Sequence, residues 1–241
     1  MHCWIQNAFS TASDTGKTLP ICLGWNLDSA RIRNQRCGIE MEKHKVEFPE
    51  LLWPFLQVPD DYVVLDLETT GLFDEGGAPS ILTIGVVDVS RGQAVSEIEY
   101  RARPSRPITE GARAVHGISE AEASEFPEIN NCWDDLLSIL HGRLVVIHNA
   151  AFDWMVINET ARKHKFRVPH VEGVFCSQKS SYPWALAVGL EVSARGPSLD
   201  SLTRKFEIHD MRADIEGLHG ALVDAKQTAS LVEVLKECAK G

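Results

Sequence analysis

The sequence predicts a mixed α/β fold in which an antiparallel three-strand meander and further parallel strands form one sheet flanked by helices. Two observations lead to this expectation. Strand-like runs at residues 62–65, 80–89 and 93–103 follow one another with only loops between them, as in an antiparallel meander. Beyond residue 103, short apolar runs alternate with helical patterns, as in parallel strands that are joined by helices.

The first strand, Tyr62–Leu65, is uniformly apolar and is therefore expected to be buried. Ahead of it, Phe48–Val58 contains two prolines and precedes a third, so we expect a short turn or helix that packs on the domain. The second strand, Ser80–Val89, follows a glycine-rich loop, and the turn signal Arg91-Gly92 separates it from the third, Gln93–Arg103.

The second half of the chain contributes the remaining strands and most of the helices. Helices are expected at Thr109–Val115, Ser119–Ala123, Glu128–Leu140, Asn149–His164, Ser177–Val188, Ser198–Phe206 and Ala221–Ala239. Strands are expected at Leu144–His148 and Val171–Phe175. Ser198, behind a proline, is the expected N-cap of its helix, and Gly217–Gly220 is expected to form a loop.

The length of the chain suits one domain with an extension. Residues 1–58 show no sustained periodicity and are predicted to be irregular or partly ordered, and residues 59–241 are predicted to form the domain. The chain has 24 basic and 34 acidic residues, and since residues 1–58 hold six of each, the whole excess of ten acids lies in the domain. This charge does not suit a broad basic surface that grips duplex DNA. If the partner is a phosphodiester, metal ions must supply most of the local neutralisation.

The six cysteines are scattered, with no pairing or spacing typical of a zinc site. We therefore expect reduced thiols and a cytoplasmic protein. No apolar stretch approaches the length of a membrane span, and no basic region followed by an apolar core marks the N-terminus, so no membrane association is expected.

Two acids, Asp66 and Glu68, follow the first buried strand. Side chains alternate along a strand, so both carboxylates are expected on one face, where they repel each other. A divalent cation removes this conflict, and carboxylate oxygens are ligands that Mg²⁺ and Mn²⁺ prefer. Taken alone, however, an Asp-x-Glu pair is more often a pair of solvated turn residues.

Three further residues indicate a functional site only when they are considered together with this pair. Asp153 opens the helix after the Leu144–His148 strand, and Asp224 lies near the start of the last helix. Each is also explained by the favourable interaction of an acid with a helix N-terminus. His219, in the glycine-flanked loop ahead of the last helix, is expected to turn back toward Asp224.

Three motifs carry a family resemblance. The segments DLETTG at 66–71, HNAAFD at 148–153 and HGALVDA at 219–225 resemble the exonuclease motifs of the DEDDh group, the DnaQ-like 3′→5′ exonucleases. The likeness to the proofreading ε subunits of bacterial DNA polymerase III is particularly clear, and it extends from about Tyr62 to Val234. The resemblance implies an RNase H-like fold and a nuclease that uses two divalent cations, Mg²⁺ or Mn²⁺.

The resemblance also implies a role for each motif residue. By motif position, Asp66, Glu68, Asp153 and Asp224 would be the metal ligands and His219 the general base. A histidine suits that role because its ordinary pKa lies near 6.5. The expected reaction releases nucleoside 5′-monophosphates one at a time from a free 3′ end.

Substrate contacts are implied in the same way. The resemblance places Thr69, Gly71 and Leu72 along the terminal nucleotide, His116 and Asn149 near its sugar and phosphate, and Phe152 against a base. For His148, Asn149 and Phe152, helix capping and packing explain the residues equally well.

Three functions remain open at this stage. The first is exonuclease action on single-stranded or frayed DNA, with a role in proofreading or repair. The second is exoribonuclease or oligoribonuclease action, since the same acids serve both substrates. The third is a non-catalytic nucleic-acid-binding accessory, which would gain nothing from four clustered acids. A DNA polymerase is a candidate partner, although the sequence ends at Gly241 without the tail by which ε subunits bind the polymerase and clamp.

Overall fold

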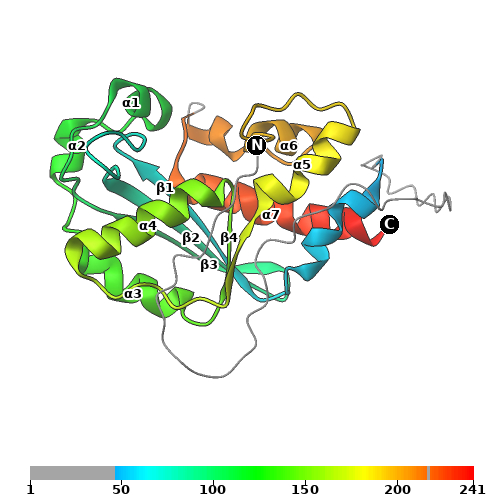
Figure 1. The fold of residues 1–241 in the computed structure, drawn as a ribbon, viewed down its shortest axis with the longest axis horizontal. Coiled ribbons are helices and arrows are strands. Elements are labelled where there is room, and N and C mark those ends of the chain that lie inside the picture. Colours follow the sequence, from blue (N-terminus) through cyan, green and yellow to red (C-terminus); the bar gives the residue numbers. More distant parts are fainter. Residues whose placement is uncertain (1–46, 216–217) are drawn as a thin grey trace. The chain divides into compact units, whose positions relative to one another are not determined.

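The computed structural model describes residues 47–215 and 218–241, so residues 1–46 of the predicted extension lie outside the description. The described elements surround a five-stranded sheet with the order β3-β2-β1-β4-β5 (Figure 1). The antiparallel meander consists of β1 (Tyr62–Thr69), β2 (Ile81–Ser90) and β3 (Gln93–Arg101). On the other side of β1, β4 (Leu144–Ile147) and β5 (Gly173–Cys176) run parallel to it. The predicted mixed sheet is confirmed.

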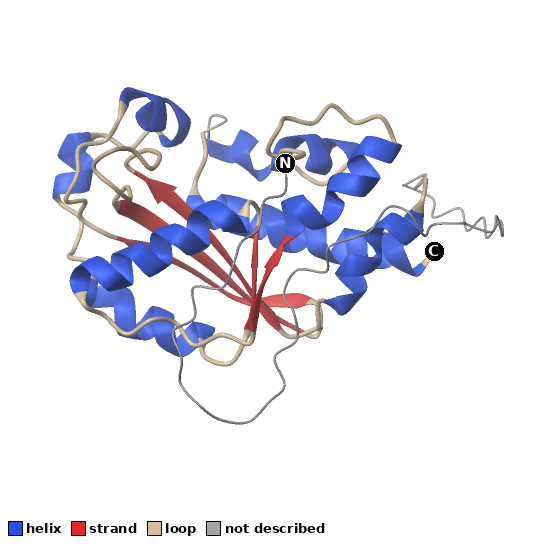
Figure 2. Ribbon diagram, viewed as in Figure 1, coloured by secondary structure: helices blue, strands red, loops and turns tan. Residues whose placement is uncertain are grey.

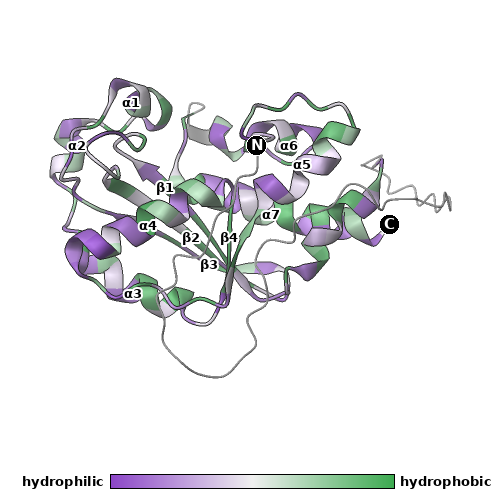
Figure 3. Cartoon of the chain, viewed as in Figure 1, coloured by the Kyte–Doolittle hydropathy of each residue, from purple (hydrophilic) through white to green (hydrophobic). Residues whose placement is uncertain are grey.

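Alternation along the strands gives the sheet two apolar faces, each covered by helices (Figures 2 and 3). Val63 and Leu65 of β1 face α3 (Asn130–Leu140) and α4 (Ala150–His164). Tyr62 and Val64 face the opposite layer, which contains α5 (Ser177–Ala187), α6 (Leu199–Lys205) and α7 (Ala221–Lys240). The 3₁₀ helix η2 (Pro49–Gln57) packs in this second layer, as expected for a short helix that leads into β1. The fold is therefore a three-layer arrangement of helices, sheet and helices.

Two short helices, α1 (Glu110–His116) and α2 (Glu120–Ser124), follow the meander. Their N-caps are Thr109 and Ser119, whose side chains accept hydrogen bonds from backbone N–H groups. Ser198 caps α6 in the same way, as predicted. One short 3₁₀ helix, η3 (Met211–Ile215), was not expected.

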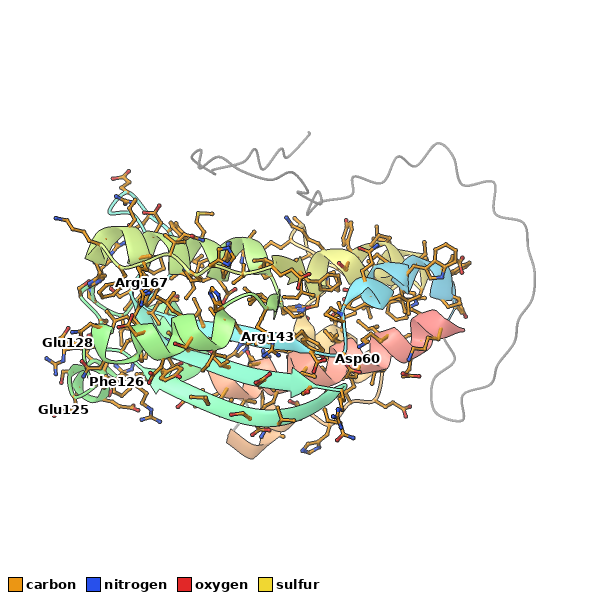
Figure 4. The ribbon with its side chains drawn as sticks, turned by 90° about the horizontal axis from the view of Figure 1, so that it is seen from below. Asp60, Glu125, Phe126, Glu128, Arg143 and Arg167 are labelled. Carbon is orange, nitrogen blue, oxygen red and sulfur yellow. The ribbon has the colours of Figure 1, made fainter. Side chains whose placement is uncertain are left out.

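Arg143, just before β4, forms hydrogen bonds at the end of the sheet where β1 begins. Its Nη2 atom donates to the carbonyl of Tyr62 at 3.1 Å, to Asp88 Oδ1 at 2.7 Å and to the carbonyl of Val89 at 3.3 Å. Figure 4 shows Arg143 beside the strands, toward the side where Asp60 precedes β1. These bonds join β1, β2 and β4 through one side chain.

Within the described residues, no helix combines the length and the apolar character that crossing a bilayer requires. The three cysteines in this part of the chain, Cys132, Cys176 and Cys238, are free thiols, as expected for a reduced protein.

Candidate active site

The site is built first from the C-terminal end of β1. Asp66 and Glu68 stand opposite Gly85 and Thr83 of β2, on the sheet face that α7 covers. Glu68 is only 7% exposed. The predicted common orientation of the two acids therefore follows from the strand itself.

The first turn of α4 brings a third acid to this strand end. Asp153 is 5% exposed, and its Oδ1 atom accepts a hydrogen bond of 3.1 Å from the backbone N–H of Leu67, which lies between Asp66 and Glu68 in β1. This bond fixes the carboxylate of Asp153 next to the first two acids, so its role is not limited to the helix N-terminus.

The first turn of α7 brings the fourth acid, Asp224, which is 4% exposed. Its proximity to β1 depends on Gly85, because a Cβ atom at this position would lie 2.1 Å from the carbonyl oxygen of Ala221. A side chain at Gly85 would therefore collide with the backbone of α7. The helix rests directly on β2, one strand away from Asp66.

His219 lies in the loop ahead of α7, as predicted, and its Nδ1 atom is 3.2 Å from Asp224 Oδ2. The loop is tied to the end of α1, since the backbone N–H of His219 donates to the carbonyl of Val115 at 3.0 Å. One potential ligand atom each from Glu68, His219 and Asp224 lie within 4.8 Å of one another. The geometry therefore admits His219 either as a ligand or as a base held by Asp224.

Burial and mutual repulsion shift the proton affinities of these acids. Burial raises the pKa of Glu68 to about 7 and that of Asp153 to about 8. Burial, reinforced by the charges of Asp153, Asp224 and Glu68, also raises the pKa of Asp66 well above its ordinary value. Without a bound cation, these raised pKa values would keep protons on the cluster, and a cation would displace them.

Asp224 differs from the other three acids. Burial raises its pKa, but hydrogen bonds from His219 and Arg212 outweigh burial and hold the pKa below its ordinary value. Arg212, on η3, donates from Nε and Nη2 to the two oxygens of Asp224, at 2.6 Å each. No hydrophobic periodicity marks η3 in the sequence. The usable signal was Asp210, whose Oδ1 atom accepts from the backbone N–H of Arg212 at 3.0 Å and so begins the short helix.

The turn after β1 holds three predicted substrate contacts. Thr69 is 7% exposed and its hydroxyl donates to the carbonyl of Gly71 at 2.8 Å, so this side chain shapes the turn. Gly71 packs against Thr109, whose Cγ2 atom would lie 3.0 Å from an added Cβ. Leu72 is 61% exposed, which leaves its side chain open to a ligand. Contact of these residues with a nucleotide stays a prediction.

His116 is 6% exposed and closes α1, whereas we expected it just after the helix. Its Nδ1 atom accepts from the N–H of Ile118 at 3.0 Å, so Nε2 carries the proton. Nε2 has no partner at hydrogen-bonding geometry among the described residues. Burial lowers the pKa of the His116 ring, although interaction with the backbone of Thr69 raises that pKa to a smaller extent. His116, Glu68 and His219 border a hollow of about 290 Å³.

The residues of the HNAAFD segment differ in whether packing and helix capping or a substrate role explains them. His148 is bonded to Ser177 Oγ at 2.9 Å and to the carbonyl of Pro197 at 3.3 Å, and burial lowers its pKa to about 4, so packing explains it. Asn149 occupies the N-cap position with a left-handed backbone, but its side chain caps nothing, so the capping interpretation is wrong there. Phe152 packs edge-on against Phe73, with ring centroids 5.9 Å apart. Substrate roles for Asn149 and Phe152 stay predictions.

A sheet of this order, with acids gathered from β1, α4 and α7, defines an RNase H-like nuclease. The chain belongs to the exonuclease family, since the family model described as Exonuclease matches residues 63–232. The predicted family is thereby confirmed.

Individual relatives agree with this assignment. The chain is 31% identical over 174 residues to DNA polymerase III subunit epsilon of Escherichia coli (strain K12), which covers 70% of this chain and 68% of that protein. It is also 31% identical over 180 residues to the PolC-type DNA polymerase III of Thermotoga petrophila, covering 73% of this chain but spanning only 12% of that much longer protein. Among solved structures, exonuclease X in complex with 5′ overhanging duplex DNA matches with a TM-score of 0.51 and 27% identity, covering 73% of this chain and 91% of that one.

Proposed function

We propose that this nuclease is a divalent-metal-dependent 3′→5′ exonuclease that removes nucleoside 5′-monophosphates from the 3′ ends of single-stranded or frayed DNA. The observation that carries the proposal is the convergence of Glu68, His219 and Asp224, whose potential ligand atoms lie within 4.8 Å of one another, beside Asp66 and the buried Asp153. A folded protein gains no stability from gathering four acids, so their common purpose is a cation.

The residues fit Mg²⁺ or Mn²⁺. Carboxylate oxygens are hard ligands, and the cluster contains no thiolate that would select a softer metal. Asp66, Glu68, Asp153 and Asp224 would hold two ions. When bound, such ions stabilise the attacking and leaving oxygens of an in-line displacement at phosphorus.

His219 would act as the general base. If its Nδ1–H donates to Asp224, the Nε2 lone pair is free to take a proton from the attacking water, and the carboxylate stabilises the imidazolium that forms. His116 lines the hollow beside Glu68, where its Nε2–H group would bind an oxygen of the terminal nucleotide. The exposed Leu72 would lie against the terminal base.

Two features support DNA as the substrate. Exonuclease X, at 27% identity, is described as a complex with 5′ overhanging duplex DNA, and the Escherichia coli relative is a DNA polymerase III subunit. A DNA polymerase is the corresponding candidate partner. We further propose that residues 59–241 form the catalytic domain.

A matched digestion tests this function. Single-stranded DNA, single-stranded RNA and a duplex with a mismatched 3′ end, each labelled at the 5′ end, are incubated with Mg²⁺ or with EDTA. We expect a ladder that shortens from the 3′ end of the two DNA substrates, with 5′-monophosphates as products and no cleavage in EDTA. Preferential loss of RNA would favour the oligoribonuclease alternative. Binding without cleavage would favour the accessory role.

A further inference from the structure

Arg212 carries a buried positive charge inside the acidic site. The residue is 6% exposed, and its guanidinium makes the two-pronged contact of 2.6 Å and 2.6 Å with Asp224. Its remaining nitrogen, Nη1, is bonded to Asp200 at the start of α6. Such paired contacts with a planar guanidinium are among the strongest hydrogen bonds in proteins.

This contact uses both oxygens of the carboxylate that a metal would need. Asp224 Oδ1 and Oδ2 each accept from Arg212, and Oδ2 also faces His219 Nδ1 at 3.2 Å. A divalent cation bound between Glu68 and Asp224 needs lone pairs of the same oxygens. The guanidinium, His219 and a cation would therefore share the roughly four lone-pair sites of one carboxylate, and the positive charges of the guanidinium and the cation repel each other.

The two anchors of Arg212 differ in a way that permits exchange. The side chain of Asp224 is 6% exposed, whereas that of Asp200 is 47% exposed. Release from Asp224 leaves Arg212 bonded to an acid at the surface, where water replaces the lost hydrogen bonds. The charge of the guanidinium is thus not stranded when the inner contact breaks.

We propose that Arg212 is a built-in counter-ion that holds Asp224 in the metal-free protein and yields it to the divalent cation by withdrawing toward Asp200. This inference rests on the proposed function and adds a consequence for its regulation. Because withdrawing Arg212 from Asp224 costs free energy, the apparent metal affinity is weakened, and the enzyme responds to a higher cation concentration than the four acids alone would set.

Metal binding, measured without nucleic acid, tests the proposal. Mn²⁺ affinity is determined by titration calorimetry and by the EPR signal of free Mn²⁺ for the full-length protein and the Arg212→Gln variant. Since the variant has no pair to break, we expect its Mn²⁺ dissociation constant to fall by about tenfold or more. An unchanged or weaker affinity in Arg212→Gln overturns the proposal, because Arg212 would then be a permanent structural partner of Asp224.

Two further variants keep the test decisive. Arg204→Gln removes the same charge from an exposed position of α6, where, among the described residues, Nε donates to the backbone carbonyl of Asp200 and to no carboxylate, and its affinity should equal that of the unaltered protein. Asp200→Asn removes the acid toward which Arg212 withdraws. Releasing Arg212 from Asp224 then costs more free energy, so Mn²⁺ should bind several-fold more weakly. An Mn²⁺ affinity equal to that of the unaltered protein would contradict the withdrawal of Arg212. If the unaltered protein binds no Mn²⁺ at all, the proposed function fails together with this inference. If the unaltered protein binds Mn²⁺ and cleaves DNA but Arg212→Gln has the same Mn²⁺ affinity, only this inference is refuted.

Discussion

Gly85 decides how closely α7 approaches β1, and the substitution Gly85→Ala tests that dependence. Gly85 stands opposite Asp66 in the sheet, and the backbone of Ala221 covers it. The added Cβ would lie 2.1 Å from the carbonyl oxygen and 2.2 Å from the carbonyl carbon of Ala221. These are backbone atoms, so no flexible side chain can yield in their place.

The displacement follows from the distances. Ordinary van der Waals contact begins at 3.4 Å, so the first turn of α7 must retreat by roughly 1 Å, carrying Asp224 with it. A misplacement of about 1 Å commonly costs about 10²-fold in catalysis. Overpacking of a filled interior costs about 1 to 3 kcal/mol of unfolding free energy.

The assay compares Gly85→Ala with a glycine that has room for a side chain. An added Cβ at Gly111, in α1, meets no atom within 4 Å, so Gly111→Ala is the matched control. We expect Gly85→Ala to lose about 10²-fold in kcat/KM on a labelled oligonucleotide and to bind Mn²⁺ more weakly while it remains folded by circular dichroism. Gly111→Ala should keep full activity. Full activity and unaltered metal affinity in Gly85→Ala would refute the argument that this close approach assembles the site.

Three other predictions concern the base, the protons and the extension. His219→Ala should retain Mn²⁺ binding by calorimetry but hydrolyse DNA about 10²- to 10⁴-fold more slowly, as expected when a general base is lost. The raised pKa values of Glu68, about 7, and Asp153, about 8, mean that the metal-free folded protein binds more protons than the unfolded chain above about pH 4. Its melting temperature in EDTA should therefore fall as the pH rises from about 5 to about 8, and Mg²⁺ should restore it. Deleting residues 1–46 should leave kcat/KM unchanged, because the acids and His219 all lie beyond residue 59.

Each of these predictions has a contrary result. Loss of metal binding in His219→Ala would make the imidazole a ligand instead of the base. A melting temperature in EDTA that rises between pH 5 and pH 8 would mean that the pKa values of the acids in the site are not raised in the folded protein. A folded but inactive deletion variant would make the extension part of the catalytic unit.

The strands and most helices were predictable because local patterns specify them. The uniform apolar run of β1, the turn at Arg91-Gly92 and the cap at Ser198 each depend on neighbouring residues alone. The common face of Asp66 and Glu68 followed from strand alternation in the same way. Boundaries shifted by a few residues, as with β1, which continues to Thr69.

The rest of the site depends on contacts between distant segments. Arg212 has no periodic neighbours, and its pairing with Asp224 appears only when η3 and α7 meet in space. His148 looked equally suited to substrate and to packing, and its partners Ser177 and Pro197 come from later segments. Neither arrangement could be deduced from spacing along the chain.

The location of Asp224 in α7 has a consequence during synthesis on the ribosome. The sheet and the other three acids precede α7 along the chain, so the fourth acid and the histidine beside it are synthesised together, after the other helices and strands of this fold. A nascent or prematurely terminated chain that lacks this helix lacks one of the proposed metal ligands and exposes the apolar sheet face that α7 covers. Under the proposed function, a nascent chain therefore gains the ability to degrade nucleic acid only after α7 has been made.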